Sequence, residues 1–264
     1  AEKHKKLVKR GEMFQMLLPP SYPGSNLLQF IGSFFIKKAQ KIEENFREVK
    51  YLRAKKGVCL STGGFIFNRQ MVKEYAPKYY AGMPLGTSND QGCGIRLGQS
   101  VGGKTDHMNR VTAWRFLNPP LAFAQGIVVN KHGKRFCNEM VYGATLGDAM
   151  CEDNEGKAYL ILSAELFTES KMQANKALPF QRDMAKMLMY FNAKKKTDLE
   201  DIAKVYDLPA ENLISEVNKY NEAANSGAPC EFGKAATDVK LLEGPFYVMD
   251  ISIDSKLAPL TTLT

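Results

Sequence analysis

The chain has 264 residues, of which 44% are hydrophobic and 24% charged, as expected for a globular protein with one large domain or two small ones. No apolar run is long enough to span a membrane, and the first residues lack the pattern of a secretory signal. The five cysteines form no C-x-x-C pair and the three histidines are scattered, which predicts reduced thiols, a cytoplasmic location and no metal site.

The net charge of +8 comes entirely from the first part of the chain. Residues 1–56 contain 13 Lys or Arg and 5 Asp or Glu, whereas residues 57–264 contain 23 of each class. This basic stretch has no aromatic RNA-binding motif, so we expect a solvated basic face and no nucleic-acid partner. Attraction of other anionic partners stays open.

Hydrophobic spacing and turn residues predict alternating helices and short strands. Helices are expected at residues 3–14, 27–45, 71–75, 95–102, 168–175, 178–190, 198–206 and 210–224. Strands are expected at residues 58–60, 128–129, 158–162 and 246–253, the last returning the chain to its first domain. Lys194–Lys196 is most simply a solvated loop.

Two segments in the first half are suited to a phosphate or a flat ring. Ser61, Thr62, Gly63 and Gly64 directly follow the expected strand 58–60, where small side chains let backbone N–H groups approach a ligand. Asn68 comes next, and a loop reading TSNDQGCG then opens a helix and provides Asn89, Asp90, Gly92 and Gly94.

A third segment, GIVVNKHGKRFCNEMVYG over residues 126–143, combines an apolar strand, a polar turn and the pair Asn138-Glu139. Such a unit can present polar groups at a cleft, although an ordinary hairpin would have the same pattern.

Together and in this order, the three segments resemble the flavoprotein family of fumarate reductases and 3-ketosteroid dehydrogenases. The resemblance implies FAD, bound noncovalently, with the glycine, serine, threonine, asparagine and aspartate residues of the first two segments as its ligands. It implies a positioning role for Asn138 and Glu139. Phe116, in WRFLNPP, could line a pocket for a sterol-sized ligand or belong to the core.

The resemblance also implies a fold: an α+β cap (substrate) domain fused to part of an α/β FAD-binding domain. We expect a partial FAD-binding domain with an N-terminal helical segment at residues 1–113, the substrate-covering cap at 114–245, and a return strand at 246–264. The family's N-terminal G-x-G-x-x-G turn and its C-terminal flavin segment are not found. The chain is then either part of a larger flavoprotein or a truncated form.

The residues after Asn138-Glu139 discriminate between chemistries. Fumarate reductases of the family place a proton-donating Arg where this chain has Gly143, whereas Tyr142 resembles the ketosteroid 4,5-dehydrogenase subgroup. A phenol can serve as the general base that removes a proton next to a ketone. Tyr142 is therefore the candidate catalytic residue, with a polar wall or a buried structural tyrosine as alternatives.

The expected function is dehydrogenation or reduction of a C–C bond next to a ketone, in a hydrophobic steroid-like molecule, with an unknown electron acceptor. Two alternatives remain: a fumarate or enoate reductase with an unrecognised acid, and a noncatalytic remnant that acts as a binding or complex-building subunit.

Overall fold

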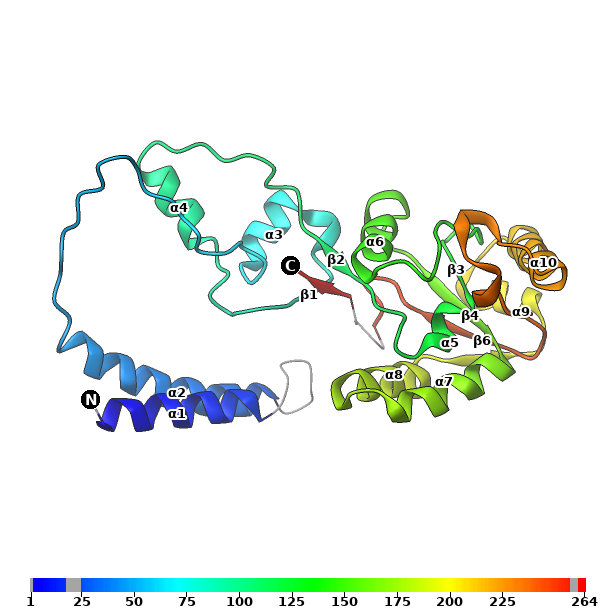
Figure 1. The fold of residues 1–264 in the computed structure, drawn as a ribbon, viewed down its shortest axis with the longest axis horizontal. Helices are drawn as coiled ribbons and strands as arrows, with labels where there is room; N and C mark the ends of the chain where they lie inside the picture. The colour runs from blue at the N-terminus through cyan, green and yellow to red at the C-terminus, as the bar shows by residue number, and fades with distance from the viewer. Residues whose placement is uncertain (1, 18–24, 257–260) are drawn as a thin grey trace. The chain divides into compact units, whose positions relative to one another are not determined.

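The computed structural model describes residues 2–17, 25–256 and 261–264, and divides the chain into two compact units, Ala1–Cys59 and Leu60–Thr264. The first unit is a helical hairpin of α1 (Glu2–Met16) and α2 (Ser25–Glu44), which lie side by side in Figure 1. Gly11 and Gly32 face each other where the helices cross, and a Cβ atom at Gly32 would lie 2.8 Å from the carbonyl oxygen of Gly11. Small residues therefore set the close approach of the two helices.

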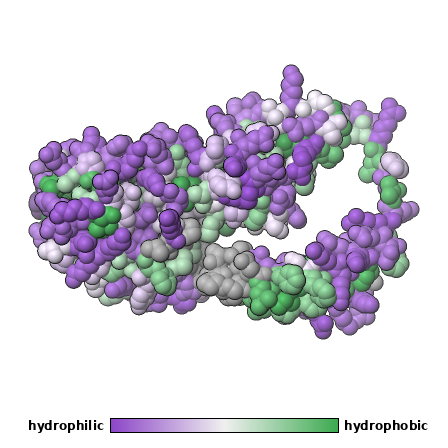
Figure 2. All heavy atoms as spheres, turned by 180° about the vertical axis from the view of Figure 1, so that it is seen from behind, coloured by the Kyte–Doolittle hydropathy of each residue, from purple (hydrophilic) through white to green (hydrophobic). Residues whose placement is uncertain are grey.

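Apolar side chains also lie on the outside of this hairpin. Leu27, Phe30 and Phe34 follow a helical spacing on α2 and are exposed. Figure 2 shows apolar residues gathered on the surface of the helical pair.

The second unit contains two small sheets and the helices around them. Its helices are α3 (Arg69–Tyr75), α4 (Cys93–Ser100), α5 (Leu121–Ala124), α6 (Gly143–Asp148), α7 (Ala164–Lys176), α8 (Pro179–Phe191), α9 (Leu199–Tyr206) and α10 (Ala210–Ser226). Short 3₁₀ or π turns are η1 (Pro77–Tyr79), η2 (Ala149–Asp153), η3 (Glu231–Gly233) and η4 (Ala236–Asp238). The strands are β1 (Met83–Pro84), β2 (Ala113–Trp114), β3 (Ile127–Val129), β4 (Tyr159–Ser163), β5 (Lys194–Lys196), β6 (Phe246–Asp250) and β7 (Thr262–Leu263).

The larger sheet has the order β3-β4-β6-β5 and is antiparallel throughout. All five residues of β4 are buried, because helices pack against both of its faces. On one face Phe167 of α7 stacks on Tyr247 of β6 at 3.8 Å, and on the other Tyr159 of β4 packs on Tyr206 of α9 at 4.6 Å. Figure 1 shows α7 and α8 running along this sheet.

The smaller sheet has the order β1-β7-β2, with β7 parallel to β1 and antiparallel to β2. The segment from residue 246 onwards thus provides β6 to the larger sheet and β7 to the smaller one. The predicted three-part domain division stays a prediction.

Two local predictions are wrong. Val58–Leu60 is not a buried strand: Val58 is 78% exposed, and no strand of the described residues pairs with this segment. Lys194–Lys196 is not a loop but the edge strand β5, paired with β6. Lysines suit an edge strand because their charge opposes pairing with another chain.

Candidate functional site

The two predicted cofactor segments of the first half lie against each other. The N–H of Gly92 donates to the carbonyl of Gly64 at 2.9 Å, and the N–H of Phe67 donates to that of Asp90 at 3.0 Å. Asn68 caps α3 by accepting from the N–H of Met71 at 3.2 Å. The glycine-rich turn and the loop before α4 therefore form one unit, although some 30 residues separate them along the chain.

Glycine is required within this unit for two reasons. Gly63 and Gly92 have φ values of +76° and +73°, in the left-handed region that other residues rarely adopt. A Cβ atom at Gly63 or Gly94 would also overlap Asp90 Oδ1 or Thr62 Oγ1, so that those side chains would have to move. Gly64, in contrast, has no atom within 4 Å of the position of a Cβ.

A hollow of about 340 Å³ lies beside these segments, with Thr62, Gly63, Gly94, Gly98 and Gly103 among its lining residues. The N-terminus of α4 has no capping side chain, so its first N–H groups are available to a phosphate or carbonyl oxygen. A glycine-lined hollow with a hydroxyl and a free helix N-terminus fits part of a dinucleotide such as FAD.

Not every predicted cofactor residue lines this hollow. Ser61 and Gly64 are exposed next to it, and Asn68 donates its side-chain amide to the carbonyl of Gln91 at 3.2 Å. Asn89 donates its backbone N–H to Thr87 Oγ1 at 3.3 Å. The cofactor roles of these residues stay predictions.

The predicted catalytic residue, Tyr142, belongs to a cluster of three aromatic rings at the N-terminus of α6. Its ring centroid lies 4.9 Å from that of Trp114 and 6.3 Å from that of Phe116, in edge-to-face geometry. Trp114 is held by a 2.8 Å hydrogen bond from Nε1 to Thr264 Oγ1. Tyr142 is 61% exposed, so it is not a buried structural tyrosine within the described chain.

Gly143, next to Tyr142, is enclosed by this cluster. A Cβ atom at Gly143 would lie 2.7 Å from Phe116 Cδ1, and the carbonyl of Gly143 accepts the N–H of Arg115 at 2.8 Å. A side chain at the position where fumarate reductases are expected to place an Arg would thus have to displace the ring of Phe116.

Glu139 lies in a buried network of charges that joins distant parts of the chain. Its Oε1 accepts the N–H of Val128 at 3.0 Å and Arg135 Nε at 2.9 Å. Its Oε2 accepts Arg135 Nη2 at 2.8 Å and Lys234 Nζ at 3.2 Å, and Lys234 also donates to the carbonyl of Gly126 at 2.7 Å. The carboxylate is 2% exposed, so it holds β3, the turn and the segment around Lys234 together.

Charge and burial compete within this network. Burial lowers the pKa of Lys234, and the attraction of Glu139 offsets only part of that effect. Burial also opposes the charge of Arg135, but its hydrogen bonds to Glu139 raise its pKa above the ordinary value. Asn138 has a local role: its Oδ1 accepts the N–H of Met140 at 2.9 Å. The positioning roles of both predicted residues stay predictions.

A mostly apolar pocket of about 180 Å³ lies beside the aromatic cluster and shares Phe116 with it. Its lining residues come from the segment after β2, from α5, from α8 and from the smaller sheet, and include Arg115, Pro119, Phe123, Ala185 and Leu188. Arg115 was not among the residues predicted from the sequence. Its only signal was a charged residue inside the apolar run WRFL.

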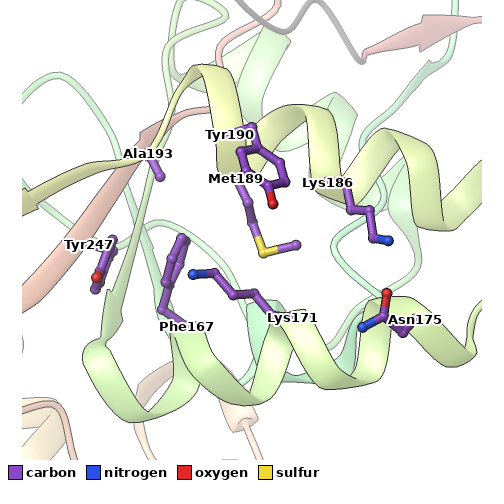
Figure 3. A pocket seen from close by; sticks show the side chains of 8 residues that line it. All are labelled: Phe167, Lys171, Asn175, Lys186, Met189, Tyr190, Ala193 and Tyr247. Carbon is purple, nitrogen blue, oxygen red and sulfur yellow. The ribbon is translucent and has the colours of Figure 1, made fainter.

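The opposite face of α8 borders a more open hollow of about 390 Å³ (Figure 3). Lys171 of α7 and Lys186 of α8 come from facing helices, and Lys171 Nζ lies 4.6 Å from the ring centroid of Phe167. This hollow is lined by the exposed Lys171 and the half-buried Lys186, and it shares no lining residue with the pocket at Arg115.

Residues 2–17, 25–256 and 261–264 contain no cluster of three or more His, Cys, Asp or Glu residues able to hold a metal. Within the same ranges, no helix combines the length and apolarity that crossing a bilayer requires. All five cysteines are free thiols.

Residues 37–258 match the FAD binding domain family, and the chain belongs to this family. The predicted family and its cofactor, FAD, are thereby confirmed.

Among its relatives, 3-oxo-5-alpha-steroid 4-dehydrogenase of Comamonas testosteroni is 37% identical over 191 residues, which are 71% of this chain and 36% of the relative. Fumarate reductase 1 of Saccharomyces cerevisiae is 26% identical over 71% of this chain and 44% of its own. The chain therefore spans less than half the length of either relative.

A solved structure of a ketosteroid dehydrogenase also matches part of this chain. The 3-ketosteroid Δ4-(5α)-dehydrogenase of Rhodococcus jostii RHA1, in complex with 4-androstene-3,17-dione, superimposes with a TM-score of 0.63 at 26% identity. The match covers 80% of this chain and 41% of that one.

Proposed function

We propose that this chain is part of an FAD-dependent oxidoreductase that dehydrogenates, or reduces, a C–C bond next to a ketone in a steroid-like molecule. The observation that carries the proposal is the exposed Tyr142 at the start of α6, held between Trp114 and Phe116. The Comamonas relative supports it, since its name assigns it to a 3-oxosteroid and it shares 37% identity with this chain.

In the proposed reaction Tyr142 acts as the phenolate, whose oxygen accepts the proton from the carbon next to the ketone. Trp114 and Phe116 restrict the Tyr142 ring and offer apolar surface to a flat substrate. FAD, when bound, supplies the two-electron acceptor for the hydrogen on the neighbouring carbon. In the reductive direction Tyr142 returns the proton.

We propose that the residues around the glycine-lined hollow hold part of FAD. Thr62 and Gly94 approach it from two segments, and the N-terminus of α4 favours a negatively charged or polar oxygen there. We further propose that residues 114–245 cover the substrate as a cap domain. The family membership supports both assignments.

The alternatives have less support. Residue 143 is Gly and not the arginine expected in fumarate reductases, and a side chain there would have to displace the ring of Phe116. The Comamonas relative and the yeast reductase are enzymes by name, which argues against a noncatalytic subunit. The free thiols suit the cytoplasm, which we keep as the proposed location.

The proposal is tested with Tyr142→Phe in the flavin-loaded protein, assayed with a saturated 3-ketosteroid and an artificial electron acceptor. Loss of a general base should lower turnover by about 100-fold, while the flavin absorbance bands persist. Tyr190→Phe, at an exposed tyrosine of α8, is the matched control and should leave turnover unchanged. Unchanged turnover in Tyr142→Phe would mean that Tyr142 lines the site and does not act as the general base.

A further inference from the structure

Arg115 is a buried cation without a partner in the described part of the chain. The residue is 1% exposed, and its Nε is enclosed without a hydrogen-bond acceptor. No carboxylate of residues 2–17, 25–256 and 261–264 forms an ion pair with it. Asp250 influences it only through longer-range attraction. An isolated charge in an apolar surrounding is unfavourable by several kcal/mol, so such groups normally have a counter-charge.

The guanidinium stays charged in spite of its burial. Desolvation lowers the pKa of Arg115 to about 10, which is still well above neutral pH. The protein therefore keeps a positive charge in this place under ordinary conditions.

The surroundings of Arg115 form a defined cavity rather than a packed core. The pocket of about 180 Å³ is walled mainly by Phe116, Pro119, Phe123, Ala185 and Leu188. Gln181 and Thr262 add a few polar atoms to its lining. Such a cavity suits a compact apolar body, and the guanidinium suits a single anionic group on that body.

We propose that this pocket binds a small apolar molecule that carries one carboxylate, with Arg115 as its counter-ion. A carboxylate can accept two parallel N–H groups of a guanidinium and neutralise its charge. A neutral ketone or amide can accept hydrogen bonds but leaves the charge uncompensated, so an anion is the favoured occupant.

This pocket adjoins the proposed reaction site but does not include its catalytic residue. Tyr142 is not among the residues that line the pocket, and only Phe116 belongs to both the pocket and the aromatic cluster. The inference therefore does not depend on flavin chemistry, and it is tested without measuring turnover.

The chain provides its own reporter for the test. Trp114 is its single tryptophan, precedes Arg115, and packs on Phe116 with ring centroids 5.5 Å apart. We would titrate the intact protein with cyclohexanecarboxylate, and separately with the neutral cyclohexanecarboxamide. Tryptophan fluorescence and titration calorimetry would be followed in parallel.

Cyclohexanecarboxylate is expected to bind saturably and at least about tenfold more tightly than the amide, because only the anion forms charge-assisted hydrogen bonds. Arg115→Met should weaken the binding of the carboxylate by at least about tenfold. Ala185→Leu, which fills the cavity and keeps the charge of Arg115, should weaken the binding of both compounds. Arg110→Met removes an exposed arginine nearby in sequence and should change neither affinity.

Three results of the binding experiments would overturn the proposal. The first is an absence of binding by both methods, and the second is equal affinity for the acid and the amide. The third is full carboxylate affinity in Arg115→Met. Thermal denaturation guards against misfolding of this variant: removal of an unpaired buried charge should raise its Tm in the absence of ligand. A lowered Tm would show that the guanidinium already has a partner within the protein, and would also overturn the proposal.

Discussion

At the scale of single residues, Gly143 shows how one missing side chain shapes the candidate site. Its carbonyl holds the backbone of Arg115, and Phe116 occupies the space where its Cβ would be. The identity of residue 143 therefore influences both the aromatic cluster and the pocket next to it.

We predict that Gly143→Ala lowers the free energy of unfolding by about 1–3 kcal/mol, because the added methyl overlaps the Phe116 ring. The measurement is urea denaturation. In a Phe116→Ala background the same change should have little effect, since the overlapping ring is gone. A full effect in both backgrounds would contradict the steric explanation.

A second prediction concerns the buried carboxylate of Glu139. Glu139→Gln should lower the free energy of unfolding by about 3 kcal/mol, because Lys234 and Arg135 would lose their counter-charge in a buried place. Glu155→Gln, in the exposed pair with Lys131, should lower it by less than about 1 kcal/mol. Equal losses of stability in the two variants would mean that burial does not increase the contribution of Glu139 to stability.

The sequence located the candidate residues better than their partners. Local patterns were enough to identify the glycine turn, the loop before α4 and Tyr142, because those signals lie within a few neighbouring residues. Lys234 and Arg115 were missed, because the role of each depends on residues that only the fold brings next to it. Lys234 meets Glu139 across 95 positions of sequence, and Arg115 is buried by α8.

At the scale of elements, the longer helices were predicted well because amphipathic spacing and capping residues are local. Asp198, for example, caps α9 by accepting the N–H of Asp201 at 2.8 Å. Strands depend on distant partners instead. β5 was missed because it pairs with β6 about fifty residues later, and Val58–Leu60 resembles a strand but has no pairing strand in the described chain.

One contact between short elements should make stability depend on pH. Glu152 of η2 accepts Lys78 Nζ at 2.7 Å and the Tyr79 hydroxyl at 2.6 Å, and these hydrogen bonds lower its pKa. A carboxylate with a lowered pKa in the folded state stabilises the protein above its usual pKa of about 4.3. That stabilisation is lost as the pH falls through the lower, folded-state value.

Glu152→Gln should therefore lose stability at pH 7 and show a smaller further loss between about pH 5 and pH 3 than the unmodified protein. Because Glu152 is partly exposed, we expect a change of about 1 kcal/mol or less. Tm measured across this pH range is the check, with Glu200→Gln, at an exposed residue of α9, as control. An unchanged acid-side slope would speak against this contact.

At the scale of the whole molecule, the chain consists of a helical hairpin and a larger mixed unit. Residues 47–59, which follow α2, contain no helix or strand and are exposed, and they include Arg53, Lys55 and Lys56. An exposed segment without hydrogen-bonded structure is a preferred site of proteolysis.

Brief digestion with trypsin should therefore cut first after Arg53, Lys55 or Lys56 and leave a resistant fragment that begins near Gly57. The internal comparison is β5, whose Lys194 and Lys195 are also exposed but belong to a sheet. Mass spectrometry of the earliest products identifies the cut. Earlier cleavage within Lys194–Lys196 would contradict the assigned sheet.

The order of strands in the larger sheet also has a consequence for how the protein is made. β4 pairs with β6 along its whole length, from Ser163 with Phe246 to Tyr159 with Asp250. At the usual rate of translation, on the order of ten seconds pass between synthesis of the two strands. During that interval the apolar residues of β4 have no partner on that side. The nascent chain is thus a natural client for a chaperone at the ribosome until residue 250 has left the exit tunnel.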